Sequence, residues 1–137
     1  MERIKAIPAK LEKSKVKKAR ILVVDDEEGI CNMLRKILAK EGYEVETAQD
    51  ARTGINLYKK NKYNLMFMDV VMPGLGGLKA LKEIKKINAK AKVILITGKP
   101  IDRRIFDKLA EGGAYTCIKK PFRLDELINI VNHALVK

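Results

Sequence analysis

A chain of 137 residues, of which 47% are hydrophobic and 34% charged, fits one globular domain with a buried core. No apolar stretch approaches the roughly 18 residues that span a bilayer, and the first residues lack the apolar core of a secretory signal, so membrane insertion and export are not expected. Cys31 and Cys117 make neither a disulfide framework nor a metal-ligand spacing, which favours a reducing, cytoplasmic compartment.

Residues 1–19 form a basic extension ahead of the domain predicted over residues 20–137. Residues 1–20 carry eight Lys or Arg against two Glu, so six of the twelve excess positive charges lie there. The plain interpretation is a solvated segment, and the alternative is a docking arm for an acidic partner or nucleic acid. Nucleic acid is not expected to be the main partner, because the chain has no aromatic platform or recognisable helix-turn-helix. Such a role could coexist with another function.

From Arg20 onward, strand and helix patterns alternate. Strands are predicted at Ile21–Val24, Tyr43–Ala48, Asn64–Met68, Lys92–Ile96 and Ala114–Ile118. Helices are predicted at Gly29–Glu41, Ala51–Lys60, Gly76–Asn88, Ile101–Glu111 and Arg123–Val136, the last with Leu124 on its buried face. Strict alternation predicts an α/β fold: a doubly wound, five-stranded parallel sheet with helices on both faces and right-handed crossovers.

The strand that begins at Asn64 is apolar without alternation from Leu65 to Met68, and the turn signal Pro73-Gly74 follows shortly after. Such a strand is buried on both faces, as in the middle of a parallel sheet. Tyr43–Ala48 alternates instead and is typical of an edge strand. With the flavodoxin-like strand order 2-1-3-4-5, the first and third strands flank the point where ligands bind, outside the carboxyl ends of the strands.

Polar residues follow four of the predicted strands: Asp25 and Asp26, Asp69, Thr97, and Lys120 before Pro121. Each one alone could cap a helix or end a strand. Together they predict a phosphoryl-transfer site, in which Asp69 is the nucleophile and Thr97 and Lys120 hold the phosphoryl oxygens. Carboxylates brought this close repel one another, and their oxygen-only donor set suits Mg²⁺ or, as a second choice, Mn²⁺.

These stretches resemble the receiver domains of two-component response regulators, in particular single-domain regulators of the chemotaxis type. The matching segments are Ile21–Glu27, Met68–Gly74 with Gly77-Leu78, Ile96–Gly98, and Gly113-Ala114 through Lys120-Pro121-Phe122. The resemblance implies that Asp69 accepts a phosphoryl group from a histidine kinase or a histidine phosphotransfer protein.

The resemblance also implies the roles of the other site residues. Asp26, Asp69 and the carbonyl of Val71 would bind Mg²⁺ directly, and Asp25 would act largely through water. The lysine of the family is the one before proline, which selects Lys120 over Lys119, and the Lys120–Pro121 peptide bond would be cis.

The expected protein is a stand-alone phospho-acceptor switch rather than an enzyme, with Mg²⁺-dependent self-phosphorylation and slow autodephosphorylation. Its output would use the face formed by the fourth helix, the fifth strand and the fifth helix. At the position where many receivers carry a rotating aromatic residue this chain has Cys117, with Tyr115 two residues earlier. The switch is therefore predicted to work without that rotation. A phosphatase of the haloacid-dehalogenase type is the enzyme alternative, but it would need Asp-x-Asp after the first strand rather than adjacent aspartates.

Overall fold

The computed structural model describes residues 19–72, 74–100 and 102–136. Residues 1–18 of the predicted basic extension, Pro73, the predicted helix start Ile101, and Lys137 lie outside this description. The strands are β1 Arg20–Val24, β2 Glu44–Ala48, β3 Leu65–Asp69, β4 Val93–Thr97 and β5 Thr116–Lys119. The helices are α3 Glu28–Lys40, α4 Ala51–Lys60, α5 Gly77–Ile87, α6 Arg103–Glu111 and α7 Leu124–Leu135. In the described part, no helix is both long and apolar enough to cross a bilayer.

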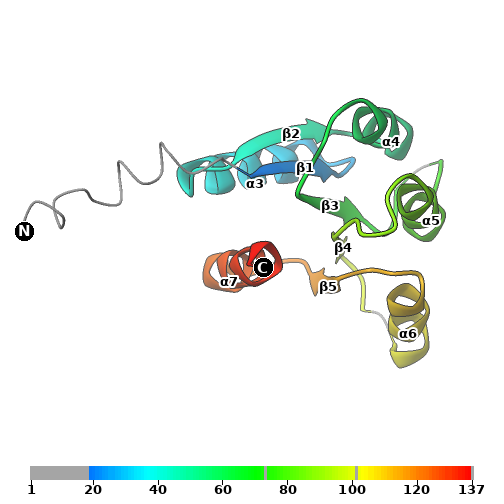
Figure 1. The fold of residues 1–137 in the computed structure, drawn as a ribbon. Coiled ribbons are helices and arrows are strands. Elements are labelled where there is room, and N and C mark those ends of the chain that lie inside the picture. Colours follow the sequence, from blue (N-terminus) through cyan, green and yellow to red (C-terminus); the bar gives the residue numbers. More distant parts are fainter. Residues whose placement is uncertain (1–18, 73, 101, 137) are drawn as a thin grey trace, which may run out of the picture.

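The five strands form one parallel sheet in the order β2-β1-β3-β4-β5, which confirms the predicted fold. Helices α3 and α7 cover one face, and α4, α5 and α6 cover the other (Figure 1). Because all the strands run in one direction, their carboxyl ends lie at the same edge of the sheet, here called the carboxyl edge. The amino-terminal ends of the strands and the last turns of the helices lie at the opposite edge, here called the amino edge.

The core has two layers because successive residues of a strand point to opposite faces of the sheet. In β1, Ile21 and Val23 face α3 and α7, whereas Leu22 and Val24 face α4 and α5. All four of these side chains are fully buried, as are most of those of β3 and β4. Burial on both faces explains why the central strands read as continuous apolar runs.

Most strand and helix limits differ from the predictions by one or two residues, and four of these differences have a clear cause or concern the site. Asp69 and Thr97 belong to β3 and β4, because parallel pairing continues through Asp69 to Ile96 and through Thr97 to Lys119. Strand β5 runs from Thr116 to Lys119, two residues later at its start than predicted. Helix α6 begins at Arg103, because the Asp102 carboxylate accepts a hydrogen bond from Ile105 N at 2.9 Å and caps the helix.

The two carboxy-terminal helices are buried to different extents. Among the described residues of α6, only Leu109 is buried, and Ile105 and Phe106 are 41% and 42% exposed. Helix α7 buries Leu127, Val131 and Ala134, but Leu124, predicted on its buried face, is 55% exposed. Leu124 opens the first turn of the helix, before the buried side chains begin.

Candidate functional site

The predicted site residues gather at the carboxyl edge of the sheet. Asp25 follows β1, Asp69 and Thr97 end β3 and β4, and Lys120 follows β5. Asp25, Asp69 and Thr97 are the only polar residues among the described ones that are buried, at 0%, 4% and 3% exposed. A buried polar side chain needs a partner to offset the loss of hydration, so the contacts of these three define the site.

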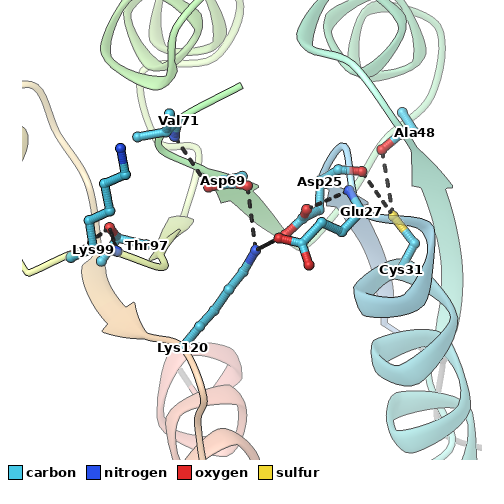
Figure 2. A network of polar contacts seen from close by, with 9 residues as sticks. All are labelled: Asp25, Glu27, Cys31, Ala48, Asp69, Val71, Thr97, Lys99 and Lys120. Atoms are coloured by element: carbon cyan, nitrogen blue, oxygen red, sulfur yellow. Dashed lines mark hydrogen bonds and ion pairs between the residues drawn. The ribbon is translucent and has the colours of Figure 1, made fainter. Parts of the chain in front are cut away.

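Lys120 joins the acidic residues (Figure 2). Its ammonium lies 3.0 Å from Asp25 Oδ2, 3.1 Å from Glu27 Oε2 and 3.5 Å from Asp69 Oδ2. Burial by itself would lower the pKa of Lys120, but its interactions with Asp25, Glu27 and Asp69 outweigh this and raise the pKa above its usual 10.5. Lys120 therefore stays protonated at any physiological pH. The neighbouring Lys119 is exposed, and the Lys120–Pro121 peptide bond is cis, as predicted.

Backbone hydrogen bonds hold Asp25 in place. Its Oδ1 accepts a hydrogen bond from Glu27 N at 2.8 Å, and its own N–H donates to the carbonyl of Ala48 at 3.0 Å. The Cys31 thiol, from the first turns of α3, donates to the Asp25 carbonyl at 3.3 Å. The turn between β1 and α3 is thereby fixed against β2, and the carboxylate points toward Lys120.

The oxygens of Asp25, Asp26 and Glu27 provide a set of donors that fits a hard divalent cation. Carboxylate oxygens from these three residues lie within 4.8 Å of one another. Although Asp25 Oδ2 is close to Lys120, it receives no well-aligned hydrogen bond from any described residue. A hydrated cation such as Mg²⁺, held by the exposed carboxylate of Asp26, would supply this buried oxygen with a water molecule as its donor. Asp69 is connected to this group through Lys120.

Asp69 is a buried carboxylate whose ionised form is disfavoured. Burial, and next the charge of Asp25, raise its pKa from 3.8 to about 6, against the opposing effects of Val71 N–H and Lys120. Val71 N donates a hydrogen bond to Asp69 Oδ1 at 3.2 Å, which leaves Oδ2 on the side of Lys120. At neutral pH Asp69 is ionised, and the attraction of a cation would strengthen that form.

The Thr97 hydroxyl is engaged within its own turn. It donates to the Lys99 carbonyl at 2.9 Å and accepts from Lys99 N at 3.1 Å. Figure 2 shows the Thr97–Lys99 turn at the same edge of the sheet but apart from the cluster around Lys120. The structure therefore brings Asp25, Asp69 and Lys120 into contact and leaves Thr97 beside them.

Two contacts of the site were not predicted. The first is the ion pair between Glu27 and Lys120, which are 93 residues apart in the sequence. The second is the hydrogen bond that the Thr97 hydroxyl donates to the Lys99 carbonyl. The run of four acids from Asp25 to Glu28, directly after a buried strand, was the available signal for the first. Cys117 is half-buried, and Tyr115 is 37% exposed with its hydroxyl 2.6 Å from His133 Nδ1 on α7. That the switch works without the rotation of an aromatic side chain at position 117 stays a prediction.

Gly77→Ala is expected to damage the site from a distance. A Cβ at position 77 would lie 2.7 Å from Val70 Cα and 2.8 Å from its carbonyl oxygen, closer than atoms approach one another, so the segment after Asp69 would have to shift. We expect a loss of about 1–3 kcal/mol in the free energy of unfolding, measured by urea denaturation. Gly29→Ala, where a Cβ meets nothing within 4 Å, is the control and should cost nothing. Equal stability of the two variants would contradict the close packing at Gly77.

The chain is similar to one protein family over most of its length. The profile of the family described as the response regulator receiver domain matches residues 21–132. The Chemotaxis protein CheY of Bacillus subtilis is 36% identical over 117 residues, which cover 85% of this chain and 97% of the relative. The Chemotaxis protein CheY of Thermotoga maritima is 34% identical and is covered to 94% by 82% of this chain. The match to Regulatory protein AtoC of Escherichia coli, 38% identical over 85% of this chain, spans only 25% of that longer protein.

Solved structures show the same architecture. A response regulator receiver domain protein (CheY-like) from Methanospirillum hungatei aligns with a TM-score of 0.83 at 30% identity, over 87% of this chain and 94% of the other. The beryllofluoride-activated NtrC4 receiver domain aligns with a TM-score of 0.80 at 34% identity, over 85% and 95%. The sequence and the fold therefore lead to the same family.

Proposed function

Because this chain belongs to the CheY-like receiver domains of two-component response regulators, we propose that it is a phospho-acceptor switch in which Asp69 carries the phosphoryl group. The observation that supports this most directly is the contact of Lys120 with both Asp25 and Asp69 at the carboxyl edge of the sheet. One protonated amine beside a buried nucleophilic carboxylate is an arrangement suited to phosphoryl transfer. The domain would comprise residues 20–137, with residues 1–19 as its basic extension.

In the proposed reaction Asp69 Oδ2 attacks the phosphorus of a phosphohistidine on a histidine kinase or phosphotransfer protein. The new O–P bond forms as the P–N bond breaks, and the electron pair of the broken bond returns to the imidazole, which then takes up a proton. The transition state spreads negative charge over the equatorial oxygens of the phosphoryl group. Lys120, 3.5 Å from Asp69 Oδ2 before the reaction, is placed to hold one of these oxygens.

Asp26, Asp69 and the carbonyl of Val71 would hold Mg²⁺, with Asp25 acting through water. A bound divalent cation supplies charge neutralisation between the carboxylates and the incoming phosphoryl group. The Thr97 hydroxyl would leave its turn with Lys99 to donate a hydrogen bond to a phosphoryl oxygen. The Thr97 hydroxyl has one proton to donate, so a hydrogen bond to the phosphoryl group would replace the one to the Lys99 carbonyl. This exchange would couple phosphorylation to the β4–α6 loop.

The output of this switch would pass through α6, β5 and α7 to a downstream protein. Ile105 and Phe106 on α6 and Tyr115 ahead of β5 are large and exposed, which suits a docking surface. Lys99 and Arg103 lie in or next to the β4–α6 loop, which would move with Thr97. Both side chains could respond to the negative charge of the phosphoryl group. The protein would act as a stand-alone receiver that dephosphorylates itself slowly.

The proposed function is tested by labelling with acetyl phosphate in the presence of Mg²⁺. The wild-type chain should form an acyl phosphate that is stable in acid and labile in base, and the phosphopeptide should contain Asp69. Asp69→Asn should remove the label entirely because the amide is not a nucleophile at this step. Lys120→Ala should retain some uptake but lose the response to it. A phosphopeptide that maps to Asp25 or Asp26 would refute the assignment.

Mg²⁺ is expected to stabilise the folded chain in a saturable way. Its site exists only when β1 and β3 are assembled, so binding adds RT ln(1 + [L]/Kd), or about 1.4 kcal/mol at ten times Kd. Thermal unfolding across a magnesium titration measures the effect, and Asp26→Asn should lose most of it. An unchanged melting curve at millimolar Mg²⁺ would count against the site.

A further inference from the structure

Positive charge is concentrated on one part of the folded domain. Residues 51–92, which include α4 and α5, carry ten Lys or Arg against Asp69 and Glu83, whereas residues 19–50 carry four Lys or Arg against eight acids. Asp69 is buried in the site, and Glu83 lies 3.7 Å from Arg52. The outer surface of α4 and α5 and the loops after them, here called the α4–α5 face, therefore has no unpaired acid among its described residues.

Seven lysines of this face are exposed. The exposed ones are Lys59, Lys60, Lys62, Lys79, Lys82, Lys86 and Lys90. None of them forms an ion pair with any residue in the described ranges. On α5, Lys79, Lys82 and Lys86 follow the spacing of one helical stripe, about 10 Å long at 1.5 Å per residue.

Compensation of the helix dipoles explains only part of this pattern. Lysines in the last turns of α4 and α5, such as Lys60 and Lys86, interact favourably with the negative ends of those helices. Lys79 lies in the first turn of α5, where a cation is unfavourable, and Lys82 lies in the middle of the helix. Lys62 and Lys90 lie in loops. The helix dipoles therefore do not explain why Lys62, Lys79, Lys82 and Lys90 lie on this face.

A hollow opens at the amino edge of this face. It has a volume of about 460 Å³, and its lining includes Lys59, Lys62, Asn61, Asn64 and Ile87. Asn64 exchanges two backbone-directed hydrogen bonds of 2.8 Å with Arg20, the first residue of β1. Arg20, which carries a further positive charge, therefore lies next to one of the residues that line the hollow.

We infer that the α4–α5 face binds the phosphate backbone of a nucleic acid without reading its sequence. Lysine side chains are flexible point charges suited to phosphates, and a stripe of about 10 Å matches roughly three phosphates along one strand. Specific protein interfaces are depleted in lysine and enriched in aromatic residues and Arg, unlike this face. Of its described residues only Ile87 offers an exposed apolar side chain at the hollow, which is little for insertion into a lipid surface.

The inference does not rest on the proposed phosphorylation, because the hollow lies at the amino edge and Lys120 at the carboxyl edge. It is compatible with the sequence-based expectation that nucleic acid is not the main partner but that such a role could coexist with another function. Backbone binding needs neither an aromatic platform nor a recognition helix; it needs unpaired cations on one surface.

The test is a fluorescence-anisotropy titration of a short labelled DNA duplex, and of single-stranded RNA of equal length, with the full chain over a range of salt concentrations. The triple variant Lys59→Gln, Lys62→Gln, Lys86→Gln should bind at least about tenfold more weakly, and its slope of log K against log salt should fall by about 2–3. The control removes the same charge elsewhere, by Lys36→Gln, Lys40→Gln and Lys108→Gln, and should change binding less than about twofold.

Three further measurements make the result decisive. The triple variant should keep its melting temperature and its acetyl-phosphate labelling, and the loop variant Lys62→Gln, Lys90→Gln should weaken binding independently of the helices. An equal loss in the control variant would show that net charge alone binds and would overturn the inference. Preference for phosphatidylserine vesicles or for polyglutamate over both nucleic acids would also overturn it, as would no saturable binding at physiological salt.

Discussion

Lys120→Met is expected to lower the free energy of unfolding by about 3 kcal/mol at neutral pH in the absence of divalent cations. The ammonium is the shared partner of Asp25, which is fully buried, and of Asp69, which is 4% exposed. Removing it leaves two buried carboxylates facing each other without a compensating charge. Met keeps most of the length of the stem, so the loss measured by urea denaturation reports the charge rather than packing.

The pH dependence of this loss has a defined sign. Because the pKa of Lys120 is raised in the folded state, its contribution is complete below the unfolded value of 10.5 and disappears only as pH rises through the higher folded value. Wild type should therefore show no loss from this group between pH 6 and pH 9. In Lys120→Met, Mg²⁺ or a lower pH should restore part of the stability, since either one neutralises the carboxylates.

The matched control for this prediction is Lys119→Met. Lys119 is exposed, adjacent in sequence and in no ion pair with a described residue, so its loss should change stability by less than about 0.5 kcal/mol. Comparable destabilisation by the two substitutions would show that the Lys120 ion pairs contribute nothing specific.

Asp69→Asn is expected to act in the opposite direction and to stabilise the fold by about 2 kcal/mol above pH 7 without divalent cations. The pKa of Asp69 rises from 3.8 to about 6 on folding, so the fold favours the protonated form. The stability associated with that form is present below the unfolded pKa and is lost as pH rises through about 6. Asn resembles the protonated carboxyl group and can still accept the hydrogen bond from Val71 N.

The difference between Asp69→Asn and wild type should therefore be absent below about pH 4 and complete above about pH 7. Thermal unfolding measured across this range checks both the size and the sign. Saturating Mg²⁺ should narrow the difference, because wild type binds the cation through the carboxylate that the variant lacks. A variant less stable than wild type at pH 8 would show that the ion pair with Lys120 outweighs the cost of burying the charge.

The fold was predictable because its signals are local. The apolar runs at Ile21–Val24 and Leu65–Met68, and the helical spacing between them, identify buried parallel strands before any contact is known. The limits were harder, since a strand ends where its neighbour stops pairing. Asp69 and Thr97 extend their strands because Ile96 and Lys119 lie opposite them, and a pattern within one segment contains no information about its neighbour.

The site was predictable in its membership but not in its contacts. Parallel strands bring their carboxyl ends together, so Asp69 and Lys120 could be placed at one edge from the order of the elements. Which oxygen each cation contacts depends on side-chain directions that are set by tertiary packing. The pairing of Glu27 with Lys120 and the closure of Thr97 onto its own turn belong to that second kind of information.

Helices α3 and α7 cover the same face of the sheet, but α7 is synthesised much later than α3. The layer made by Ile21, Val23 and Phe67 is completed by Leu127 and Val131, which are synthesised about 60 or more residues after Phe67. The Tyr43 hydroxyl donates a hydrogen bond to Asn132 Oδ1 at 3.4 Å, and this contact can form only after the 89th residue beyond Tyr43 has been made. Until α7 has been made, α3 alone covers this face of the nascent sheet, and the part that α7 would cover stays open to other chains. A premature stop within α7 would therefore yield an aggregating species, not a shortened but working domain.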